Sequence, residues 1–583
     1  MGILTNLYIR LAPALLPILE FALMLGAGFL ILRRTNPGKS SLLSSLERNF
    51  ERLARRRTLA AFSVGASVVL VRVALIPILG IPQPRSHDEF SYLLAADTFV
   101  HGRLTNPTHP MWVHLETFHE IQRPTYMSIY PPAQGLVLAA GQMLHPSSIG
   151  QKKIEHAWIG QLLVTGCMCS ALCWMLQAWV PAPWALLGGV LAGLRLGLLS
   201  YWMNGYWSAS LPALGGALVL GAWPRLGRHR LARDGALLAL GLFILANTRP
   251  YEGLIFSLPF AWDMLRWFWR NRPWIPQIAP RMMLPILVVL LLGGAATSFY
   301  YWRVTGSPWQ MTYTIDRAQY GMTPFFLWQK PLRERTYNHA VLHDYYRKEL
   351  DDFDAERTVA GYLHHVAGSV VAWWRFYLGP LLTVPLLSLP WLMREKKMTL
   401  PLVVCAATAW ALAVESWDLP HYFSPALGAL YILIVQGLRH VRLWRRRAGY
   451  GRAAVRAIPL LACGMIVLRV AAVAAHTRIE GAWPRGNVKR AALFQKLDQI
   501  PGEHLVLVSY SADHNLDEEW VYNEASIDTA KVVWARHMDN AADNELLKYF
   551  EGRHVWWLNA DEPQLTPQGS EAFLTKPPPA SRD

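Results

Sequence analysis

Long apolar runs recur along most of this chain and constrain its fold more than any other feature. A run of roughly 20 apolar residues with few charges is long enough to cross the hydrocarbon core of a bilayer as a helix. The sequence holds about twelve such runs. They lie near residues 8–32, 59–81, 156–180, 183–201, 206–223, 235–247, 251–269, 284–301, 366–393, 400–414, 422–438 and 457–475. The pattern predicts a polytopic α-helical membrane protein with about twelve transmembrane helices.

The composition agrees with this fold and argues against a nucleic-acid-binding protein. Hydrophobic residues make up 53% of the 583-residue chain and charged residues 16%, whereas soluble domains carry roughly a quarter charged residues. Lys and Arg exceed Asp and Glu by 56 to 40, which gives a formal charge of +16. We assign this excess to loops that meet anionic membrane lipids, and we expect no nucleic acid among the partners.

The positive charges also predict an orientation. Basic residues concentrate in the stretch 33–57 and, further on, in loops that follow every second apolar run. Since cytoplasmic loops are enriched in Lys and Arg, these loops are expected inside the cell. The first run, 8–32, is then expected to be a retained helix that enters from outside. The long segments 82–155 and 303–365, and the chain after residue 476, are expected to face outward.

The tail differs from the rest of the chain in composition. Short β-type runs lie at 504–509, 530–535 and 554–558, with a polar helical stretch at 540–550. We predict two units, a transmembrane domain 1–475 with catalytic outer loops and a small α/β extracytoplasmic domain 476–583. A solvated loop is expected for four carboxylates of the tail, with a substrate surface as the alternative: Asp513, Asp517, Glu518 and Glu519.

Two adjacent carboxylates, Asp88 and Glu89, open the first outer segment. Paired carboxylates at a membrane boundary are costly unless they are solvated or used. A carboxylate beside a bound acceptor can take the proton of a hydroxyl or amine that attacks an activated sugar. The alternative is a solvated turn in which Asp88 caps the following helix. The sequence leaves both interpretations open.

Five short stretches at predicted outer helix ends carry a resemblance to a known family. They are 88–92, with Asp88, Glu89 and Tyr92; 130–135, which begins Tyr130-Pro131-Pro132; 201–207; 247–253, with Arg249-Pro250; and 421–426, which begins His421-Tyr422. In this arrangement the membrane region resembles the polytopic C-type glycosyltransferase (GT-C) superfamily, in particular its RgtA/B/C/D-like group. The lipid A aminoarabinose transferase and the protein O-mannosyltransferases are relatives of that group. The resemblance implies a GT-C fold in the bacterial cytoplasmic (inner) membrane, with the large loops and the C-terminal domain in the periplasm.

The resemblance also implies a sugar donor linked to polyprenyl phosphate and a lipid, glycan or protein acceptor. Asp88 corresponds to the catalytic base and Glu89 to its second-line partner, with inversion at the anomeric carbon. Arg249 is expected to bind the donor phosphate, because Pro250 breaks the helix at the outer interface and a guanidinium can hold phosphate through two bonds. An interfacial arginine that extends to lipid headgroups is the alternative.

Further contacts around the donor follow from the same resemblance. The expected donor-phosphate contacts are Tyr130, His421 and Tyr422. The expected substrate-shaping residues are Tyr92, Asn204 and Glu252. One branch of the superfamily has a Lys before the Pro-Pro pair, where this chain has Ile129-Tyr130. The alternative for this segment is therefore to position the loop through its Pro-Pro turn.

No certain cofactor follows from the sequence. Five histidines crowd the first outer segment: His87, His101, His109, His114 and His119. A zinc site needs three or four ligands in tetrahedral reach, and the spacing of these histidines matches no such motif. We expect no bound metal. A divalent metal ion stays an alternative because some GT-C relatives depend on one.

Four charged residues stand inside the apolar runs: Glu20, Arg72, Arg195 and Arg375. An ionisable side chain at membrane depth indicates a functional site, while ion pairs that hold helices together are an equal alternative. Buried charges on many helices are also typical of transporters, so a transporter or flippase for a lipid-linked sugar is the alternative function. The gathering of polar motifs at one end of the helices favours the glycosyltransferase.

Overall fold

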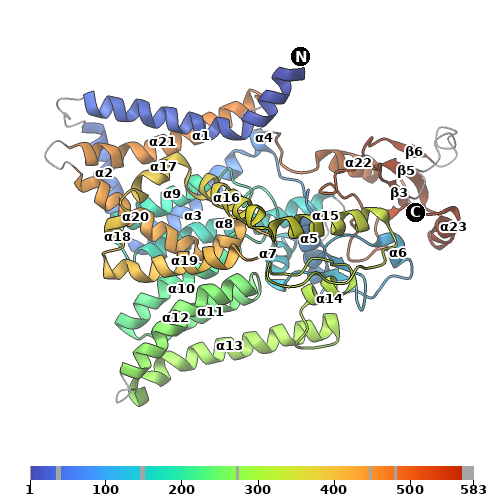
Figure 1. The fold of residues 1–583 in the computed structure, drawn as a ribbon, viewed down its shortest axis with the longest axis horizontal. Helices are drawn as coiled ribbons and strands as arrows, with labels where there is room; N and C mark the ends of the chain where they lie inside the picture. The colour runs from blue at the N-terminus through green and yellow to red at the C-terminus, as the bar shows by residue number, and fades with distance from the viewer. Residues whose placement is uncertain are drawn as a thin grey trace.

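The computed structural model describes residues 2–33, 41–144, 151–270, 275–444, 449–477 and 482–567. Parts of the outer segment 82–155, of the basic loop 439–456 and of the tail 476–583 therefore lie outside the described residues. Figure 1 shows helices packed side by side over much of the molecule, with a small sheet at one end of its long axis. The outer segments lie between these two parts.

Every predicted apolar run coincides with one or more helices. The main ones are α1 (Gly2–Arg33), α3 (Arg57–Ala74), α8 (Gln151–Leu176), α9 (Ala182–Ala192), α10 (Ser210–His229), α11 (Ala232–Ala246), α12 (Pro250–Arg270), α13 (Ile275–Thr305), α16 (Val359–Trp373), α19 (Thr399–Leu412), α20 (Leu427–Leu443) and α21 (Tyr450–Ala474). Among the described residues, five helical segments are long and apolar enough to cross a membrane: Arg57–Ala74, Lys152–Leu176, Met282–Thr305, Pro420–Leu443 and Tyr450–Ala474. The chain is a membrane protein, and the number of about twelve spans stays a prediction.

Small residues let neighbouring helices approach closely. A Cβ on Gly65 of α3 would lie 2.3 Å from the carbonyl oxygen of Gly166 in α8. Likewise, a Cβ on Gly215 of α10 would lie 3.0 Å from the carbonyl oxygen of Gly241 in α11. Backbones that touch through glycine are typical of helix interfaces in membranes, where apolar burial alone does not bring helices together.

Two of the predicted runs are broken rather than continuous. The run 183–201 holds α9 followed by a π-helical turn, η1 (Gly193–Gly197). The run 366–393 holds the end of α16, a second π-helical turn, η3 (Trp374–Leu378), then α17 (Gly379–Leu386) and α18 (Leu389–Leu392). The break at α17 falls on Gly379, whose φ of 58° suits glycine and few other residues.

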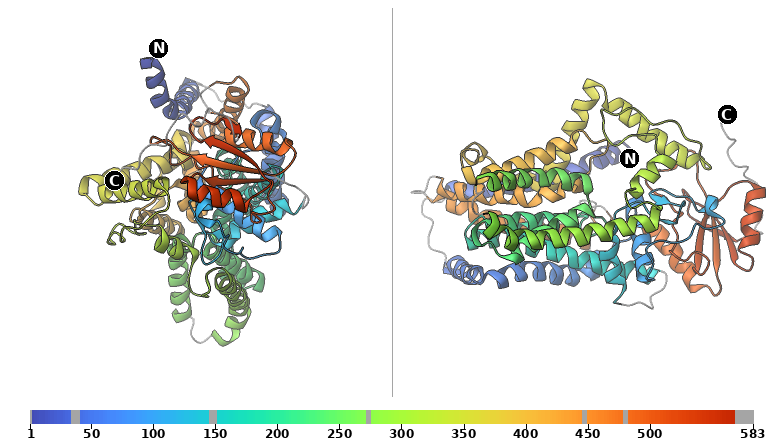
Figure 2. Two further views of the ribbon diagram at one scale, coloured as in Figure 1. Left: turned by 90° about the vertical axis from the view of Figure 1, so that its right-hand side faces the viewer. Right: turned by 90° about the horizontal axis from the view of Figure 1, so that it is seen from below.

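The basic stretch 33–57 carries a helix of its own, α2 (Ser41–Arg55). The first outer segment supplies α5 (His87–Val100), α6 (Trp112–Leu115), α7 (Pro132–Gln142) and the antiparallel strands β1 (Glu120–Ile121) and β2 (Met127–Ser128). The second outer segment supplies α14 (Thr312–Gln319) and α15 (Ala340–Glu356). Both segments lie toward the sheet end of the helix bundle in Figure 1 and Figure 2.

The tail forms a sheet whose strands lie close to the predicted ones. They are β3 (His504–Ser509), β4 (Val532–Arg536), β5 (His554–Asn559) and β6 (Leu565–Pro567), in the order β4-β3-β5-β6. Strand β3 runs parallel to β4 and β5, and β6 is antiparallel to β5. Helices α22 (Val488–Gln499) and α23 (Asn540–Tyr549) complete the unit. Its location outside the membrane stays a prediction.

One carboxylate of the tail, Glu519, is fully buried and is not part of a solvated loop. Arg536 donates from Nη2 to Glu519 Oε2 at 2.6 Å. The backbone N–H groups of Trp520 and Val521 donate to Glu519 Oε1, both at 2.8 Å. Burial alone would raise the pKa of Glu519, but the charge of Arg536 and these hydrogen bonds lower it. The expectation of a solvated loop was wrong here because the partner arginine lies on a separate strand, β4.

Candidate functional site

Helix α5 begins with a capping arrangement that assigns different roles to its two carboxylates. Ser86 is the N-cap residue, and Glu89 accepts from the backbone N–H of Ser86 at 3.2 Å and of Arg85 at 2.9 Å through Oε2. Its other oxygen, Oε1, accepts from the backbone N–H of Tyr206 at 2.9 Å. Glu89 is therefore used by backbone donors, and the alternative in which Asp88 caps the helix is wrong. The carboxylate of Asp88 points elsewhere.

The backbone donors give Glu89 a structural task at the place where we expected a second catalytic carboxylate. It is buried, and a Cβ on Gly205 would lie 2.7 Å from its Oε1. Burial raises the pKa of Glu89, which the backbone hydrogen bonds from Arg85 and Tyr206 oppose. The residue joins the start of α5 to the loop 201–207. In that position it orients Asp88 through the backbone.

The side chain of Asp88 is held by a tyrosine and a histidine. Tyr130 donates its hydroxyl hydrogen to Asp88 Oδ1, and His119 Nδ1 lies 3.0 Å from that hydroxyl and 3.4 Å from the same Oδ1. The Asp88 side chain is 21% exposed. It is thus oriented on one oxygen and reachable by another molecule.

The charges of this group favour an ionised Asp88. Burial would raise the pKa of Asp88, but the hydrogen bond and charge of His119, with the charges of His87 and Arg249, outweigh it and lower that pKa. Burial would likewise lower the pKa of His119, but its hydrogen bond with Asp88 raises it. Asp88 and His119 therefore stabilise each other's charged forms.

His119 belongs to the site although no sequence signal separated it from the other four histidines of its segment. Its backbone φ is 59°, and Ser91 Oγ donates to its carbonyl oxygen at 2.6 Å. Tyr345, from the second outer segment, lies with its hydroxyl 3.4 Å from His119 Nε2. A residue held in this backbone conformation needs support from its surroundings, and strain of this kind is frequent at functional sites. Here α5 and α15 supply the support.

Arg249, the residue that we expected to bind the donor phosphate, lies in the short link between α11 and α12. Its Nη1 lies 3.5 Å from Glu252 Oε1, and its guanidinium stacks over the ring of Tyr422 at 4.0 Å. Its Nε is buried and has no hydrogen-bond partner among the described residues. A buried guanidinium N–H without a partner is costly, so this donor is suited to a bound anion.

A second buried nitrogen without a partner among the described residues belongs to His421. Its Nδ1 lies 3.1 Å from the Tyr201 hydroxyl, and its ring contacts Tyr422 with 4.9 Å between ring centroids. Its Nε2 is buried and, within the described ranges, makes no hydrogen bond. Arg249 and His421 both contact the ring of Tyr422. The structure thus brings these three predicted donor-phosphate residues together.

Tyr92 and Tyr130 connect the two halves of the site. Their ring centroids are 4.4 Å apart, and Tyr313 of α14 lies edge-on to Tyr130 at 5.5 Å. The charge of Arg249 acts on the carboxylate of Asp88, where it contributes to the lowered pKa. We call the set Asp88, His119, Tyr130, Arg249 and His421 the outer site.

Asn204 lies in the loop 201–207, where it contacts Arg72 and the backbone. It accepts a hydrogen bond from Arg72 Nε at 2.8 Å and donates to the carbonyl oxygens of Leu198 and Ser200, both at 2.9 Å. Arg72, a charge that the sequence placed inside an apolar run, also donates to the Gly80 carbonyl at 2.7 Å. These contacts join the C-terminal end of α3 to the residues that follow η1, which is a positioning task.

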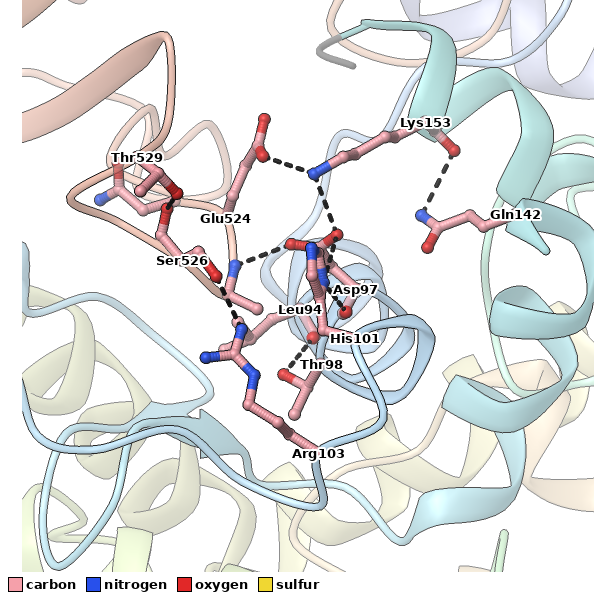
Figure 3. Close-up of polar contacts among 12 residues, drawn as sticks. Leu94, Asp97, Thr98, His101, Arg103, Gln142, Lys153, Glu524, Ser526 and Thr529 are labelled. Atoms are coloured by element: carbon pink, nitrogen blue, oxygen red, sulfur yellow. Dashed lines mark hydrogen bonds and ion pairs between the residues drawn. The ribbon is translucent and has the colours of Figure 1, made fainter. Parts of the chain in front are cut away.

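The C-terminal unit contacts the helix that carries Asp88. Lys153 bridges Asp97 of α5 at 3.1 Å and Glu524 of the tail at 2.6 Å, and the Ala525 N–H donates to Asp97 Oδ2 at 2.8 Å (Figure 3). Arg103 donates to the Ser526 hydroxyl at 2.7 Å in the same view. The tail therefore helps to fix α5 and, through it, the position of Asp88.

Comparison with solved structures found similar folds at low sequence identity. ArnT from Cupriavidus metallidurans bound to undecaprenyl phosphate is 13% identical, with a TM-score of 0.49 over 85% of this chain and 92% of that chain. The archaeal oligosaccharyltransferase AglB from Archaeoglobus fulgidus, in complex with an inhibitory peptide and a dolichol-phosphate, is 11% identical, with a TM-score of 0.43 over 85% and 69%. Both are GT-C glycosyltransferases.

No protein-family model and no curated protein matches the chain. The oligosaccharyltransferase from Archaeoglobus fulgidus is also similar as a complex with Zn and sulfate, at 12% identity and a TM-score of 0.44 over 85% of this chain and 67% of that chain. In the described part of this chain, no group of three or more His, Cys, Asp or Glu side chains has the geometry of a metal site. At these levels of similarity, the chemistry of the chain has to be argued from its own residues.

Proposed function

We propose that the protein is a membrane glycosyltransferase that moves a sugar from a polyprenyl-phosphate donor to an acceptor at the outer face of the cytoplasmic membrane. The observation that carries the proposal is the outer site itself. An oriented, partly exposed carboxylate, Asp88, lies within the electrostatic reach of a buried arginine with an unused donor, Arg249. A base for the acceptor and a cation for the leaving phosphate are the two groups that this transfer needs.

In the proposed step, an acceptor hydroxyl oxygen attacks the anomeric carbon of the sugar. The bond from that carbon to the phosphate oxygen breaks, and polyprenyl phosphate leaves with the bonding electrons. The hydroxyl proton passes to Asp88, which its lowered pKa keeps ionised at neutral pH. Attack opposite the leaving group inverts the anomeric carbon. Tyr130 and His119 occupy Oδ1, so Oδ2, the oxygen that they leave unoccupied within the described residues, would take the proton from the acceptor.

In the same proposal, Arg249 and His421 bind the phosphate. The unpartnered Nε of Arg249 would gain an anionic acceptor, and so would Nε2 of His421 in the tautomer that carries its proton there. The cost of leaving these groups unpaired would then disappear. The ion pair of Arg249 with Glu252 holds the guanidinium in place from one side, and the Tyr422 ring holds it from the other.

The test is sugar transfer by the full chain in nanodiscs. The donors are radiolabelled monosaccharides, each linked to undecaprenyl phosphate, and the acceptors are bacterial lipid extract, cell-wall glycan and membrane protein. We expect labelled product with the unaltered chain and a loss of roughly 10²- to 10⁴-fold in rate for Asp88→Asn, the range for removal of a general base. The matched control is Asp344→Asn, an exposed carboxylate of α15, which should leave the rate unchanged.

Full transfer by Asp88→Asn, with a thermal unfolding midpoint equal to that of the unaltered chain, would remove Asp88 from the mechanism. The transporter alternative gives a different result. The protein in proteoliposomes would then move the lipid-linked sugar between leaflets, and no labelled acceptor would form. Asp88→Asn would change the rate of this movement and no transfer reaction.

A further inference from the structure

A cavity of about 70 Å³ lies where helix α5, the end of α7 and the start of α8 meet the tail. One ordered water needs roughly 10–15 Å³, so the space is larger than a single water requires. We call it the tail cavity. In the part of the chain that the structure describes, its lining shares no side chain with the outer site. The proposed transfer step therefore leaves the tail cavity without a task.

Two buried side chains of the lining have a polar atom without a partner. Gln142 is 5% exposed, and its Nε2 donates to the Lys153 carbonyl oxygen at 3.3 Å, which leaves Oε1 over (Figure 3). Trp534 of β4 is 1% exposed, and within the described ranges its indole Nε1 makes no hydrogen bond. A buried polar atom in this state costs about 1–3 kcal/mol, so proteins retain few of them without a ligand or water to bind. The lining thus holds one free acceptor and one free donor.

Arg490 of α22 adds a further donor. Its guanidinium lies between the rings of Phe90 and Trp534, at 4.8 and 4.7 Å from the ring centroids. Nε donates to the Trp520 carbonyl at 3.1 Å, and Nη2 donates to the Tyr522 carbonyl at 2.9 Å. Among the described residues, Nη1 makes no hydrogen bond and the guanidinium forms no ion pair. Two rings and two carbonyls therefore fix a guanidinium that keeps one nitrogen for another molecule.

The charges of the lining favour a neutral ligand. Lys153 lies 3.1 Å from Asp97 and 2.6 Å from Glu524, and all three side chains line the cavity (Figure 3). Together with Arg490 they give two cationic groups and two carboxylates, so the lining carries no net charge. A bound anion would lie close to the two carboxylates and a bound cation close to the two cationic groups, and like charges repel.

The rest of the lining is apolar and rich in aromatic rings. The rings of Phe90 and Tyr522 stack with 4.1 Å between their centroids, and Leu93, Leu94 and Phe494 complete this wall. Apolar and aromatic walls with a few fixed polar groups are typical of sites for small molecules. A sugar ring matches such a site, because its hydroxyl groups both donate and accept hydrogen bonds while its C–H face is apolar and suits an aromatic ring.

We propose that the tail cavity binds one sugar unit of a glycan-bearing acceptor. Sugar hydroxyl oxygens accept from Trp534 Nε1 and Arg490 Nη1, and a sugar hydroxyl donates to Gln142 Oε1. Each buried atom that lacks a partner thereby gains one. That the sugar belongs to the acceptor rests on the proposed function, whereas carbohydrate binding by the cavity does not.

The position of the tail cavity relative to Asp88 decides which sugar unit it binds. Tyr522 lines the cavity, and its hydroxyl lies 2.7 Å from Nδ1 of His87, the residue before Asp88. Asp97 lies on the same helix as Asp88, about 13 Å further along it at 1.5 Å per residue. The cavity is thus connected to the outer site but too far from it to hold the reacting group. It binds a unit further along the acceptor.

The test is sugar binding by the full chain in nanodiscs, measured by saturation-transfer NMR. The probes are the methyl glycosides of glucose, galactose, mannose and N-acetylglucosamine, with cyclohexanol as a ring that carries a single hydroxyl. We expect at least one glycoside to bind, and to bind more tightly than cyclohexanol. Gln142→Met and Trp534→Phe should each weaken that binding roughly 2- to 10-fold, the value of one hydrogen bond.

Gln142→Met keeps the length of the side chain and removes an amide oxygen that has no partner, so we expect the thermal unfolding midpoint to stay unchanged. Gln177→Met is the matched control. Gln177 is also buried, lies just beyond the other end of α8, and donates from Nε2 to a backbone carbonyl at 2.8 Å. Its replacement should leave glycoside binding as it is.

Transfer gives a second measurement. With the acceptor that yields labelled product, Gln142→Met should raise KM for that acceptor and leave kcat unchanged, because a remote sugar unit is bound equally before and during the reaction. Asp88→Asn should lower kcat. A fall in kcat without a change in KM for Gln142→Met would overturn the assignment of the cavity to the acceptor.

Three binding results would overturn the carbohydrate site: no glycoside binding by the unaltered chain, cyclohexanol binding as tightly as the glycosides, or unchanged affinity in both Gln142→Met and Trp534→Phe. Displacement of the glycoside by inorganic phosphate would also overturn it, since the cavity would then select an anion. A chain that binds a glycoside but transfers no sugar would overturn the proposed function alone. A chain that transfers sugar while both variants keep full glycoside affinity would overturn this inference alone.

Discussion

Arg195 and Arg249 each pair with a glutamate, yet the two arginines are used differently. Arg195 donates from Nε and Nη2 to backbone carbonyls of η3, and its Nη1 faces Glu20. In the outer site, Arg249 pairs with Glu252 at a similar distance but keeps its Nε unused. An arginine that donates to backbone carbonyls from two of its nitrogens stabilises the fold, whereas one whose buried Nε has no partner among the described residues can bind a ligand.

The largest expected effect tests the spare donor of the outer site. Replacing Arg249 with Gln removes the charge that faces the leaving phosphate, and we expect transfer to fall roughly 10²- to 10³-fold, as for the loss of one electrostatic contact to a developing charge. Arg249→Lys should recover part of the rate, because a lysine keeps the charge without the planar donors. Single-turnover transfer measures both variants. Equal rates in Arg249→Gln and the unaltered chain would place the phosphate elsewhere.

The second effect tests the contact between Gly379 and the ion pair of Arg195 with Glu20. Gly379→Ala forces a Cβ into contact with Arg195 and Glu20 and adds a strained backbone conformation, which costs about 1–3 kcal/mol. We expect a lower thermal unfolding midpoint. Gly464→Ala on α21 is the matched control, since a Cβ there meets nothing within 4 Å. If both variants unfold at the same temperature as the unaltered chain, the contact of the ion pair with Gly379 does not stabilise the fold.

The third effect is a shift of pH dependence in the outer site. His119 favours the charged form of Asp88, so Asp88 takes up its proton only at a pH below the ordinary range for a carboxyl group. In His119→Gln this support is lost and the pKa of Asp88 rises. The acid side of the profile of kcat/KM against pH should therefore move to higher pH. An unmoved acid side would mean that the acid limb belongs to a different group.

The smallest effect concerns the contact between α5 and the tail. Lys153→Gln removes two ion pairs whose lysine is 19% exposed, so we expect a loss of about 1 kcal/mol in stability. Transfer should fall only a few-fold, because Asp88 keeps Tyr130 and His119. Thermal unfolding and transfer rate are measured together, with Lys348→Gln as a surface control. A rate loss as large as that of Asp88→Asn would give the tail a direct part in the reaction.

The helical regions and the short strands could be predicted from the sequence because their signals are local. Apolar runs identified the helices of the membrane region, and β-type runs identified β3 to β5. The positions of Asp88, Arg249 and His421 at helix ends followed from the same pattern. The backbone contacts of Glu89 could not be predicted, because its donors include Tyr206, far along the chain. Its part as a second-line partner of Asp88 stays a prediction.

His119 and Tyr345 could not be predicted, because their roles depend on where two outer segments meet. His119 lies in a loop with no periodicity and Tyr345 on α15, and only folding brings their side chains together. The same holds for Glu20, Arg195 and Arg375. The hydropathy pattern showed each of them as a charged residue inside an apolar run, but it did not indicate which of these residues would lie close together in space.

The sequence by itself determined that this chain enters a membrane and that its polar motifs gather at one end of its helices. Both follow from quantities that add up along the chain, namely the transfer of apolar side chains out of water and the cost of moving positive charge across a membrane. The tertiary structure decided which carboxylate is free, which arginine keeps an unused donor and which charges share a cavity. Those outcomes depend on hydrogen bonds and ion pairs between distant residues, which exist only once the backbone has brought the partners within about 3 Å.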